Sequence, residues 1–344
     1  MLASIDDVEV PPGFIIEEYA DVPKARSLAL GDKGTLFVSN RKGRSVYAVV
    51  ENADGSTRTI ELLRRMTTPN GIAFHKGDLF VAEIDRVYRY ADIEDNLNAV
   101  PEAEVLDIDL PSDRHHGWRY IGFGPDDKLY ISIGAPCNVC DEVGYAQIIR
   151  MNTDGSGRET FASGVRNSVG FSWHPRTGDL WFTDNGRDMM GDDIPPCELN
   201  HAPRAGLHFG FPYCHGEDVV DPRFGKGREC EDYRPPAQEL GPHVAPLGVK
   251  FYTGEMFPAE YRNQVFIAEH GSWNRSRKIG YRVTLVRLDG NRAVSYEPFA
   301  YGWLQGQSVS GRPVDLLVKE DGSLLVSDDL AGKIYRISYI GESD

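Results

Sequence analysis

A short phrase recurs six times in this chain and constrains its fold more than any other feature: an apolar triplet that follows a turn of Gly, Asp, Lys or Asn. Alternating apolar and polar runs precede most of these turns, so each copy predicts two strands joined by a tight hairpin. Several copies add a third strand after the triplet. The triplets lie at 36–38, 79–81, 129–131, 180–182, 265–267 and 324–326.

Units of this kind bury their faces only against their neighbours. Six of them in a ring predict one all-β domain over residues 1–344, a six-bladed β-propeller with four-stranded antiparallel blades. The N-terminal run GFIIEEYA is expected to close the ring by completing the sheet that KIYRISY begins. A long cysteine-containing loop insertion is expected at about 187–245.

The formal net charge of −15 argues against partners that bind through a basic patch. DNA and anionic membrane surfaces both require such a patch, so we expect no nucleic-acid partner. No apolar stretch is long enough to span a bilayer, so we expect no membrane insertion. A neutral small molecule fits this composition better.

The chain has five cysteines, a usage that points to an oxidising compartment. Cys137 and Cys140 form a CNVC turn, which is compatible with a zinc half-site, a redox motif or a tight disulfide; no second CxxC completes a zinc site, which favours the disulfide. Cys214 and Cys230 flank a polar loop that they could staple, which leaves Cys197 unpaired. The start, MLASIDDVEVPP, lacks the features of a signal peptide, so export is inferred from the cysteines and from the resemblance below.

Breaks in the repeat indicate where a site is expected, because propeller chemistry usually lies where loops converge on one mouth of the channel. RHHGWRY places His115 and His116 directly before an inner strand, and a neutral imidazole suits proton abstraction from an alcohol. GVRN places Arg166 and Asn167 at the same strand start one blade later, where a guanidinium and an amide suit a polyanionic ligand with ring carbonyls. Both pairs are also compatible with purely structural roles.

An oxygen-rich stretch follows in the fourth repeat. It contains Asp184, Gly186, Asp192, Asp193 and Glu198. Calcium takes six to eight oxygen ligands, including main-chain carbonyls that a glycine can turn towards the ion. The stretch is therefore a candidate calcium site, while a merely solvated acidic loop is the alternative.

These stretches, in this order, resemble the soluble sugar dehydrogenases that depend on pyrroloquinoline quinone (PQQ). The segments HVAPLG, AEHGSWNRS, GRPVDLLV and SDDLAGKIYRI are similar to the sorbosone dehydrogenase branch of that family. The resemblance runs from PPGFIIEEYA to KIYRISY. It implies a six-bladed propeller with PQQ over the channel, a calcium ion (Ca²⁺) that joins the quinone to the protein, a histidine base and a periplasmic or secreted location.

Carried over by position, the resemblance assigns the base to His116, with His115 where an orienting acid is often found. Val314 stands where the family has a second basic residue, and Arg275 or Lys278 is the candidate to replace that charge. The other residues that it implies in contact with the cofactor are Asn70, Arg166, Asn167 and Arg312.

The resemblance also implies metal ligands. Gly186 and Arg187 match the pair whose main-chain carbonyls bind the cofactor calcium, although Arg187 replaces the usual proline. Glu198 resembles the acidic residue of a second, structural calcium site. His243 and Pro246 are expected to border the substrate pocket.

The resulting hypothesis is an oxidoreductase that converts a sugar hemiacetal or aldehyde, of the aldose or sorbosone type, to the lactone or acid. Hydride would pass to PQQ while His116 takes the hydroxyl proton, with calcium and Arg166 opposing the charge that develops. An external quinone, cytochrome or dye would accept the electrons. Two alternatives stay open: a calcium-dependent hydrolase of the lactonase type, and a non-catalytic propeller scaffold.

Overall fold

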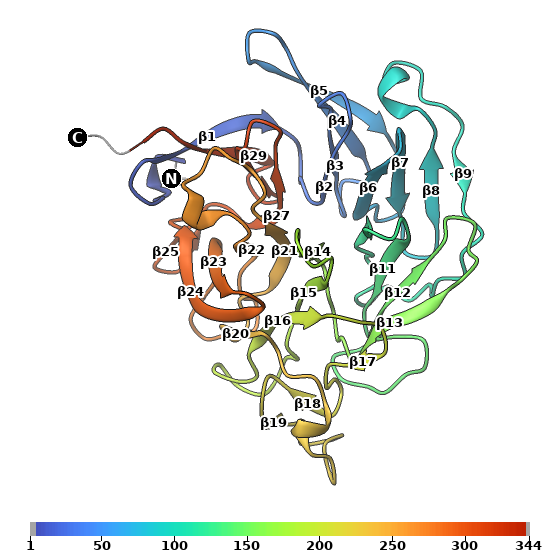
Figure 1. Ribbon diagram of the computed structural model, residues 1–344, viewed down its shortest axis with the longest axis vertical. Helices are drawn as coiled ribbons and strands as arrows, with labels where there is room; N and C mark the ends of the chain where they lie inside the picture. The colour runs from blue at the N-terminus through green and yellow to red at the C-terminus, as the bar shows by residue number, and fades with distance from the viewer. Residues whose placement is uncertain (1–4, 342–344) are drawn as a thin grey trace.

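The computed structural model describes residues 5–341, and its main sheets form a ring of six blades around one axis (Figure 1). From the axis outward, the strands of the first three blades are β2 (Leu28–Leu30), β3 (Leu36–Ser39), β4 (Val46–Glu51) and β5 (Thr57–Leu63); β6 (Gly71–His75), β7 (Asp78–Ala82), β8 (Val87–Tyr90) and β9 (Glu104–Val105); β10 (Ile121–Phe123), β11 (Leu129–Ile133), β12 (Gln147–Met151) and β13 (Glu159–Ser163).

The other three blades follow the same plan. Their strands are β14 (Phe171–Trp173), β15 (Leu180–Asp184), β16 (Cys197–Ala202) and β20 (Gln238–Leu240); β21 (Pro246–Phe251), β22 (Val265–Glu269), β23 (Arg282–Asp289) and β24 (Arg292–Ala300); β27 (Pro313–Val318), β28 (Leu324–Asp328), β29 (Lys333–Tyr339) and β1 (Phe14–Asp21). The predicted six-bladed, four-stranded antiparallel propeller is confirmed.

Short elements decorate the ring. β17 (Leu207–His208) adds to blade three, parallel to β13. Two small hairpins and four 3-10 helices complete the description: β18 (Cys214–His215) with β19 (Val219–Val220), β25 (Leu304–Gln305) with β26 (Ser308–Val309), η1 (Ile5–Asp7), η2 (Ile93–Asp95), η3 (Cys230–Asp232) and η4 (Ala259–Tyr261). No helix in the described part of the chain is long and apolar enough to cross a membrane.

All six recurring triplets fall in the second strand of a blade, in β3, β7, β11, β15, β22 and β28. Every residue of these strands is buried. A strand in this position is covered on both faces by neighbouring blades, so its side chains point into apolar surroundings on either side. This is why the phrase reads as a continuous apolar run rather than as an alternating one.

Within residues 5–341, one apolar cluster fills each of the six interfaces between blades. The cluster between blades six and one, for example, joins Leu317 and Leu325 to Leu28 and Val38. At roughly 25 cal/mol for each Å² of apolar surface buried, these interfaces are the main source of stability. No blade has a core of its own, which confirms the interpretation of the repeat.

The ring closes where the two ends of the chain meet. β1 pairs antiparallel with β29, from Phe14 opposite Tyr339 to Asp21 opposite Lys333, and Figure 1 shows both termini on this side of the ring. The ring of Phe14 is buried and packs edge-on against Phe257, at 4.8 Å between centroids. The predicted closure by GFIIEEYA is therefore confirmed.

The predicted loop at 187–245 contains two strands of the ring, because β16 and β20 are the outer strands of blade four. The insertion proper is 203–237, and its β18–β19 hairpin projects beyond the ring (Figure 1). Disulfides join Cys214 to Cys230 and Cys137 to Cys140, as expected, and Cys197 is free and buried.

We expect Phe14→Ala to lower the free energy of unfolding by about 3–5 kcal/mol, because the change leaves a cavity where β1, the strand that closes the ring, packs against blade five. Urea unfolding followed by tryptophan fluorescence measures the effect. Ile15→Ala is the matched control, since Ile15 is the next residue of β1 and is 37% exposed. Equal losses in the two variants would show that the packing of β1 does not depend on the Phe14 side chain.

Candidate functional site

The residues that precede the inner strands converge at one mouth of the channel around a cavity of about 330 Å³. Four arginines line this cavity in a chain whose net charge is −15. They come from three blades: Arg26 and Arg41 from blade one, Arg166 from blade four and Arg312 from blade six. The cavity therefore concentrates positive charge in an otherwise acidic protein.

His116 lines the same cavity, and its backbone lies in the left-handed region, with φ of 48°. Its Nδ1–H donates to the carbonyl oxygen of Ala135 at 2.9 Å, which leaves Nε2 unprotonated and without a partner among the described residues. The group that orients the ring is thus a main-chain carbonyl, while His115 contacts the ring at 4.1 Å between centroids. A Cβ on Gly134 would come within 2.6 Å of the His116 Cβ, so only glycine fits there.

The electrostatic surroundings keep His116 neutral. Burial lowers its pKa to about 2, and the Arg166 guanidinium and His115 lower it further in the same direction. The imidazole is consequently a hydrogen-bond acceptor throughout the physiological pH range. Its Nε2 lone pair is free to accept a proton. The low pKa makes the imidazole a weak base in the ligand-free protein.

Arg166 and Asn167 are fixed by the carboxylate of Asp184 at the end of β15. This carboxylate accepts hydrogen bonds from the main-chain N–H groups of Arg166 at 2.7 Å and Asn167 at 2.6 Å. The sequence presented Asp184 as part of a calcium-binding stretch, whereas in the structure it holds the Arg-Asn pair. Only 7% of Asn167 is exposed, and its side-chain amide has no partner among the described residues. The amide lines the cavity, where it can form hydrogen bonds to a ligand.

The Arg166 guanidinium holds the two neighbouring loops together. It donates to the carbonyl oxygens of Asn138 at 2.9 Å and Asn185 at 3.0 Å, and it pairs with Asp188 at 3.3 Å. Asn138 lies inside the loop closed by the Cys137–Cys140 disulfide. Arg166 is therefore both a cation of the cavity and the tie that holds the loop after β15.

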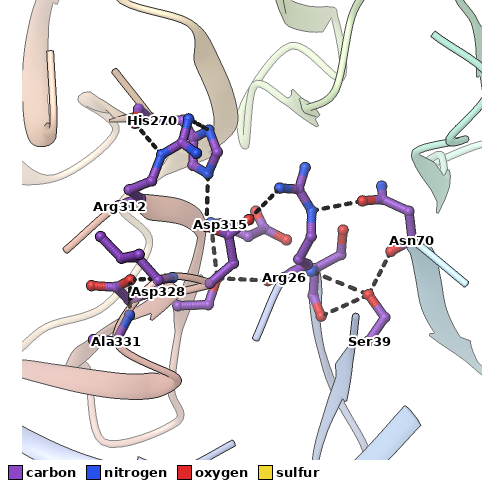
Figure 2. A network of polar contacts seen from close by, with 12 residues as sticks. Arg26, Ser39, Asn70, His270, Arg312, Asp315, Asp328 and Ala331 are labelled. Carbon is purple, nitrogen blue, oxygen red and sulfur yellow. Dashed lines mark hydrogen bonds and ion pairs between the residues drawn. The ribbon is translucent and has the colours of Figure 1, made fainter. Parts of the chain in front are cut away.

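A continuous chain of polar contacts crosses the opposite side of the cavity (Figure 2). Arg26 pairs with Asp329 at 2.8 Å, and Asp329 accepts a hydrogen bond from His270 Nε2 at 2.9 Å. His270 Nδ1 accepts from Arg312 Nη2 at 2.9 Å. Arginine only donates, so these contacts fix His270 as the neutral Nε2–H tautomer, and burial lowers its pKa to about 4. His270 thus lies between Asp329 and Arg312 and orients the Arg312 guanidinium.

Of the four arginines of the cavity, Arg41 has the fewest polar contacts with the described residues. Its guanidinium stacks over the ring of Trp118 at 4.3 Å and forms no ion pair or hydrogen bond with the described residues. Burial lowers its pKa to about 10, and the neighbouring Arg26 adds to this shift. A half-buried arginine without a carboxylate partner favours an anionic ligand.

Part of the cavity lining is apolar. Val169, Leu247 and Trp118 line the cavity, and the two aliphatic residues form a small cluster with Val314, against which Trp118 packs. The resemblance drawn from the sequence implies a second basic residue at the position of Val314, and here the Val314 side chain is 2% exposed among aliphatic groups. Arg26 and Arg41 supply positive charge from blade one instead.

Several residues that the sequence proposed as cofactor contacts lie outside the lining of this cavity. Asn70 is buried behind it, where its Oδ1 accepts a hydrogen bond from Arg26 Nε at 2.9 Å (Figure 2). Arg275 pairs with Asp193 at 2.9 Å, and Lys278 Nζ donates to the carbonyl of Gln307 at 2.7 Å. Asn70 thus contacts Arg26, and the side chains of Arg275 and Lys278 have partners outside the lining of the cavity.

Gly186 lines the cavity, and Arg187 turns its side chain away from it. The main-chain carbonyl oxygens of both residues accept no hydrogen bond from the described residues. His243 also lines the cavity, and its Nε2 lies 2.8 Å from the carbonyl oxygen of Gly191. Pro246, the first residue of β21, lies next to the lining residues Ala245 and Leu247.

Glu198 is buried opposite Asp184 on the adjoining strand β16. It accepts hydrogen bonds from Asn200 Nδ2 at 2.9 Å and from the Gly216 N–H at 2.7 Å. Burial raises its pKa to about 8, and the adjacent Asp184 carboxylate adds to the shift. Within residues 5–341, no group of three or more His, Cys, Asp or Glu side chains is placed to hold a metal.

The donor set fits PQQ, whose carboxylates require several cations and whose carbonyls accept hydrogen bonds. Arg41 and the unpaired amide of Asn167 are free to serve such a ligand. Calcium would be held here through main-chain oxygens, because the free carbonyls of Gly186 and Arg187 are the donors that the wall offers.

Sequence reasoning missed Arg26, Arg41, His270 and Asp329. Arg26, like Arg166 and Arg312, lies shortly before the inner strand of its blade, so the repeat itself carried a signal for it. Arg41, His270 and Asp329 lie just after the second strands of blades one, five and six, which is the other set of loops at this mouth.

Comparison with known proteins now identifies the family. The TrAA12-like family model matches residues 8–339. The chain belongs to the TrAA12-like family. A related protein of Borreliella burgdorferi, itself uncharacterized, is 35% identical over 350 residues, which cover 96% of this TrAA12-like chain and 91% of the other.

Solved structures share the fold of this TrAA12-like protein. A Trichoderma reesei structure of carbohydrate-active enzyme family AA12 superposes with a TM-score of 0.84 at 20% identity, covering 96% of this chain and 97% of the other. The holo PQQ domain of pyranose dehydrogenase from Coprinopsis cinerea superposes with a TM-score of 0.77 at 20% identity, with the same coverage. At this identity the likeness establishes the fold alone.

The low pKa of His116 predicts a pH dependence of stability. Below its ordinary value of 6.5 the unfolded chain takes up a proton that the folded protein excludes, so the free energy of unfolding falls as pH drops from 6.5 towards 2. In His116→Gln this loss should be smaller by about 1.4 kcal/mol per pH unit between pH 6 and 4. Urea unfolding at pH 7, 6, 5 and 4 measures the slopes. Parallel slopes in variant and wild type would contradict the buried, neutral imidazole.

Proposed function

We propose that this protein is a PQQ- and calcium-dependent dehydrogenase that oxidises a sugar hemiacetal or aldehyde to the lactone or acid. One observation carries the proposal: four arginines and a neutral histidine with a free Nε2 line the same cavity. A lactonase-type hydrolase has no use for so many cations, and a scaffold has no use for a buried proton acceptor. The solved PQQ domain of Coprinopsis cinerea and the PQQ-bound aldose sugar dehydrogenase of Streptomyces coelicolor share this fold, which supports the choice.

The cavity would hold the cofactor through its cations. Arg41, Arg312 and the Asn167 amide would bind the carboxylates and ring carbonyls of PQQ, while Arg26 and Arg166 supply positive charge from behind. The carbonyls of Gly186 and Arg187 would hold calcium. When bound, PQQ supplies the two-electron acceptor that no side chain provides.

The residues of the chain would then perform the proton chemistry. His116 Nε2 would accept the hydroxyl proton of the substrate, and the Nδ1–H bond to Ala135 keeps that nitrogen facing the cavity. Arg166 would oppose the negative charge that develops beside it. Val169 and Leu247 would give the bound ligand an apolar contact.

We propose a sugar or aldehyde as the substrate class, with sorbosone among the candidates because of the HVAPLG and AEHGSWNRS segments. The four arginines of the cavity face two carboxylates, Asp188 and Asp329, which leaves two positive charges in the protein. Calcium would add two positive charges and the three carboxylates of PQQ would remove three, so the loaded cavity would be close to neutral.

The remaining parts of the proposal concern location and electron transfer. The two disulfides favour a periplasmic or secreted protein. The reduced cofactor would be reoxidised by an external acceptor, such as a quinone, a cytochrome or an artificial dye.

Reconstitution with PQQ and calcium tests the function directly. We expect the loaded wild type to reduce a dye when aldoses or sorbosone are added, and His116→Ala to lower turnover about 10²- to 10⁴-fold, because a positioned base contributes that much. Absorbance of the bound cofactor should show that His116→Ala still binds PQQ.

His75→Ala is the control. His75 is the last residue of the inner strand β6, at the end away from the cationic cavity, so its replacement should leave turnover unchanged. Full turnover in His116→Ala would remove the histidine from the mechanism. Failure of folded, calcium-loaded wild type to bind PQQ would overturn the dehydrogenase, and calcium-dependent lactone hydrolysis would then establish the hydrolase.

A further inference from the structure

The cavity wall at 185–188 is held firmly from inside. Asn185, Gly186 and Asp188 all line the cavity. Arg166 binds the carbonyl of Asn185 and the carboxylate of Asp188, and Asn138 accepts a hydrogen bond from the Asp188 N–H at 2.9 Å. The wall belongs to the loop between β15 and β16 and has no strand partner of its own.

The same wall is also held from outside. Arg187 lies between the lining residues Gly186 and Asp188, and its guanidinium points away from the cavity to Asp221, with 2.5 Å between Nη1 and Oδ2. His215 Nε2 reaches the same carboxylate oxygen at 2.9 Å. All three side chains are buried, and the carboxylate of Asp221 is fully so.

Asp221 and His215 both belong to the 203–237 insertion, which packs directly on the back of the wall. Cys214 and His215 line a small void together with Asn185 and Gly186. The Cys214–Cys230 disulfide closes the loop that contains Asp221, and Asp221 Oδ1 accepts the N–H groups of Arg223 and Phe224 at 2.8 and 2.9 Å. The carboxylate is thus fixed in place before it meets Arg187.

We propose that Arg187, Asp221 and His215 form a brace by which the insertion positions the 185–188 wall for cofactor binding. This inference rests on the proposed function, because the wall carries the free carbonyls of Gly186 and Arg187. A loop held on both sides does not have to be ordered when the ligand binds, so its binding free energy is not spent on ordering the loop. The arginine at position 187 is therefore used as an anchor, and the insertion is part of the site.

Hydrogen exchange of the ligand-free protein tests the brace without any cofactor. Asp221→Asn removes the ion pair and keeps the shape of the side chain, and it leaves the Arg187 charge buried without its partner. We expect the amides of 185–190 to exchange at least tenfold faster in Asp221→Asn than in wild type, with no change in β7 or β28. Asp218→Asn is the matched control, since Asp218 is an exposed residue in the turn of the neighbouring β18–β19 hairpin. Unchanged exchange at 185–190 in a folded Asp221→Asn protein would overturn the brace.

The affinity for PQQ tests whether the brace positions the 185–188 wall for cofactor binding. Titration with PQQ in the presence of calcium should give a Kd at least tenfold higher for Asp221→Asn and for Arg187→Met than for wild type and Asp218→Asn. The double variant Arg187→Met/Asp221→Asn buries no unpaired charge, so its stability should recover relative to the single variants while its Kd for PQQ stays high. A Kd that returns to the wild-type value together with stability would show a merely structural contact and overturn positioning.

The two experiments separate this inference from the proposed function. Wild type that fails to bind PQQ overturns the dehydrogenase, and the exchange rates at 185–190 still decide whether the brace orders the wall. Wild type that binds PQQ with the same Kd as Arg187→Met keeps the dehydrogenase and removes the brace.

Discussion

The pairing of β1 with β29 is the interaction on which the site depends, because it brings blade six against blade one. The contact between Arg26 and Asp329 crosses this seam, as do the hydrogen bonds from the Leu28 N–H to Asp315 and from the Ser327 hydroxyl to the Arg26 carbonyl. One half of the cationic cavity therefore exists only in the closed ring.

The polar groups of the cavity fall into two sets, those held by protein partners and those left free to bind a ligand. Main-chain, carboxylate and imidazole partners fix the positions of Arg166, His116 and Arg312, so these side chains face the cavity in defined orientations before any ligand arrives. Arg41 and the Asn167 amide keep unsatisfied capacity. Fixed groups supply preorganised charge, and the two free groups supply the affinity that a ligand can gain.

The fold was largely predictable because its signal is local: every apolar triplet lies in a second strand, and the closing run lies at the N-terminus. His116 and Arg166 were singled out because they precede inner strands, and Arg312 because of the family resemblance; the structure places all three in the lining of one cavity. The Arg26–Asp329 pair joins residues 303 positions apart, and no local pattern reveals it. Arg187 shows the same limit, since its partner Asp221 lies in an insertion outside the repeat.

Val169, Leu247 and Val314 form a small aliphatic cluster beside the cationic cavity. A second cavity of about 340 Å³ lies along the inner strands and shares no lining residue with the first. The two parts of the channel are therefore built by separate sets of side chains, so substitutions along the inner strands can reshape the second cavity without replacing any residue that lines the cationic one.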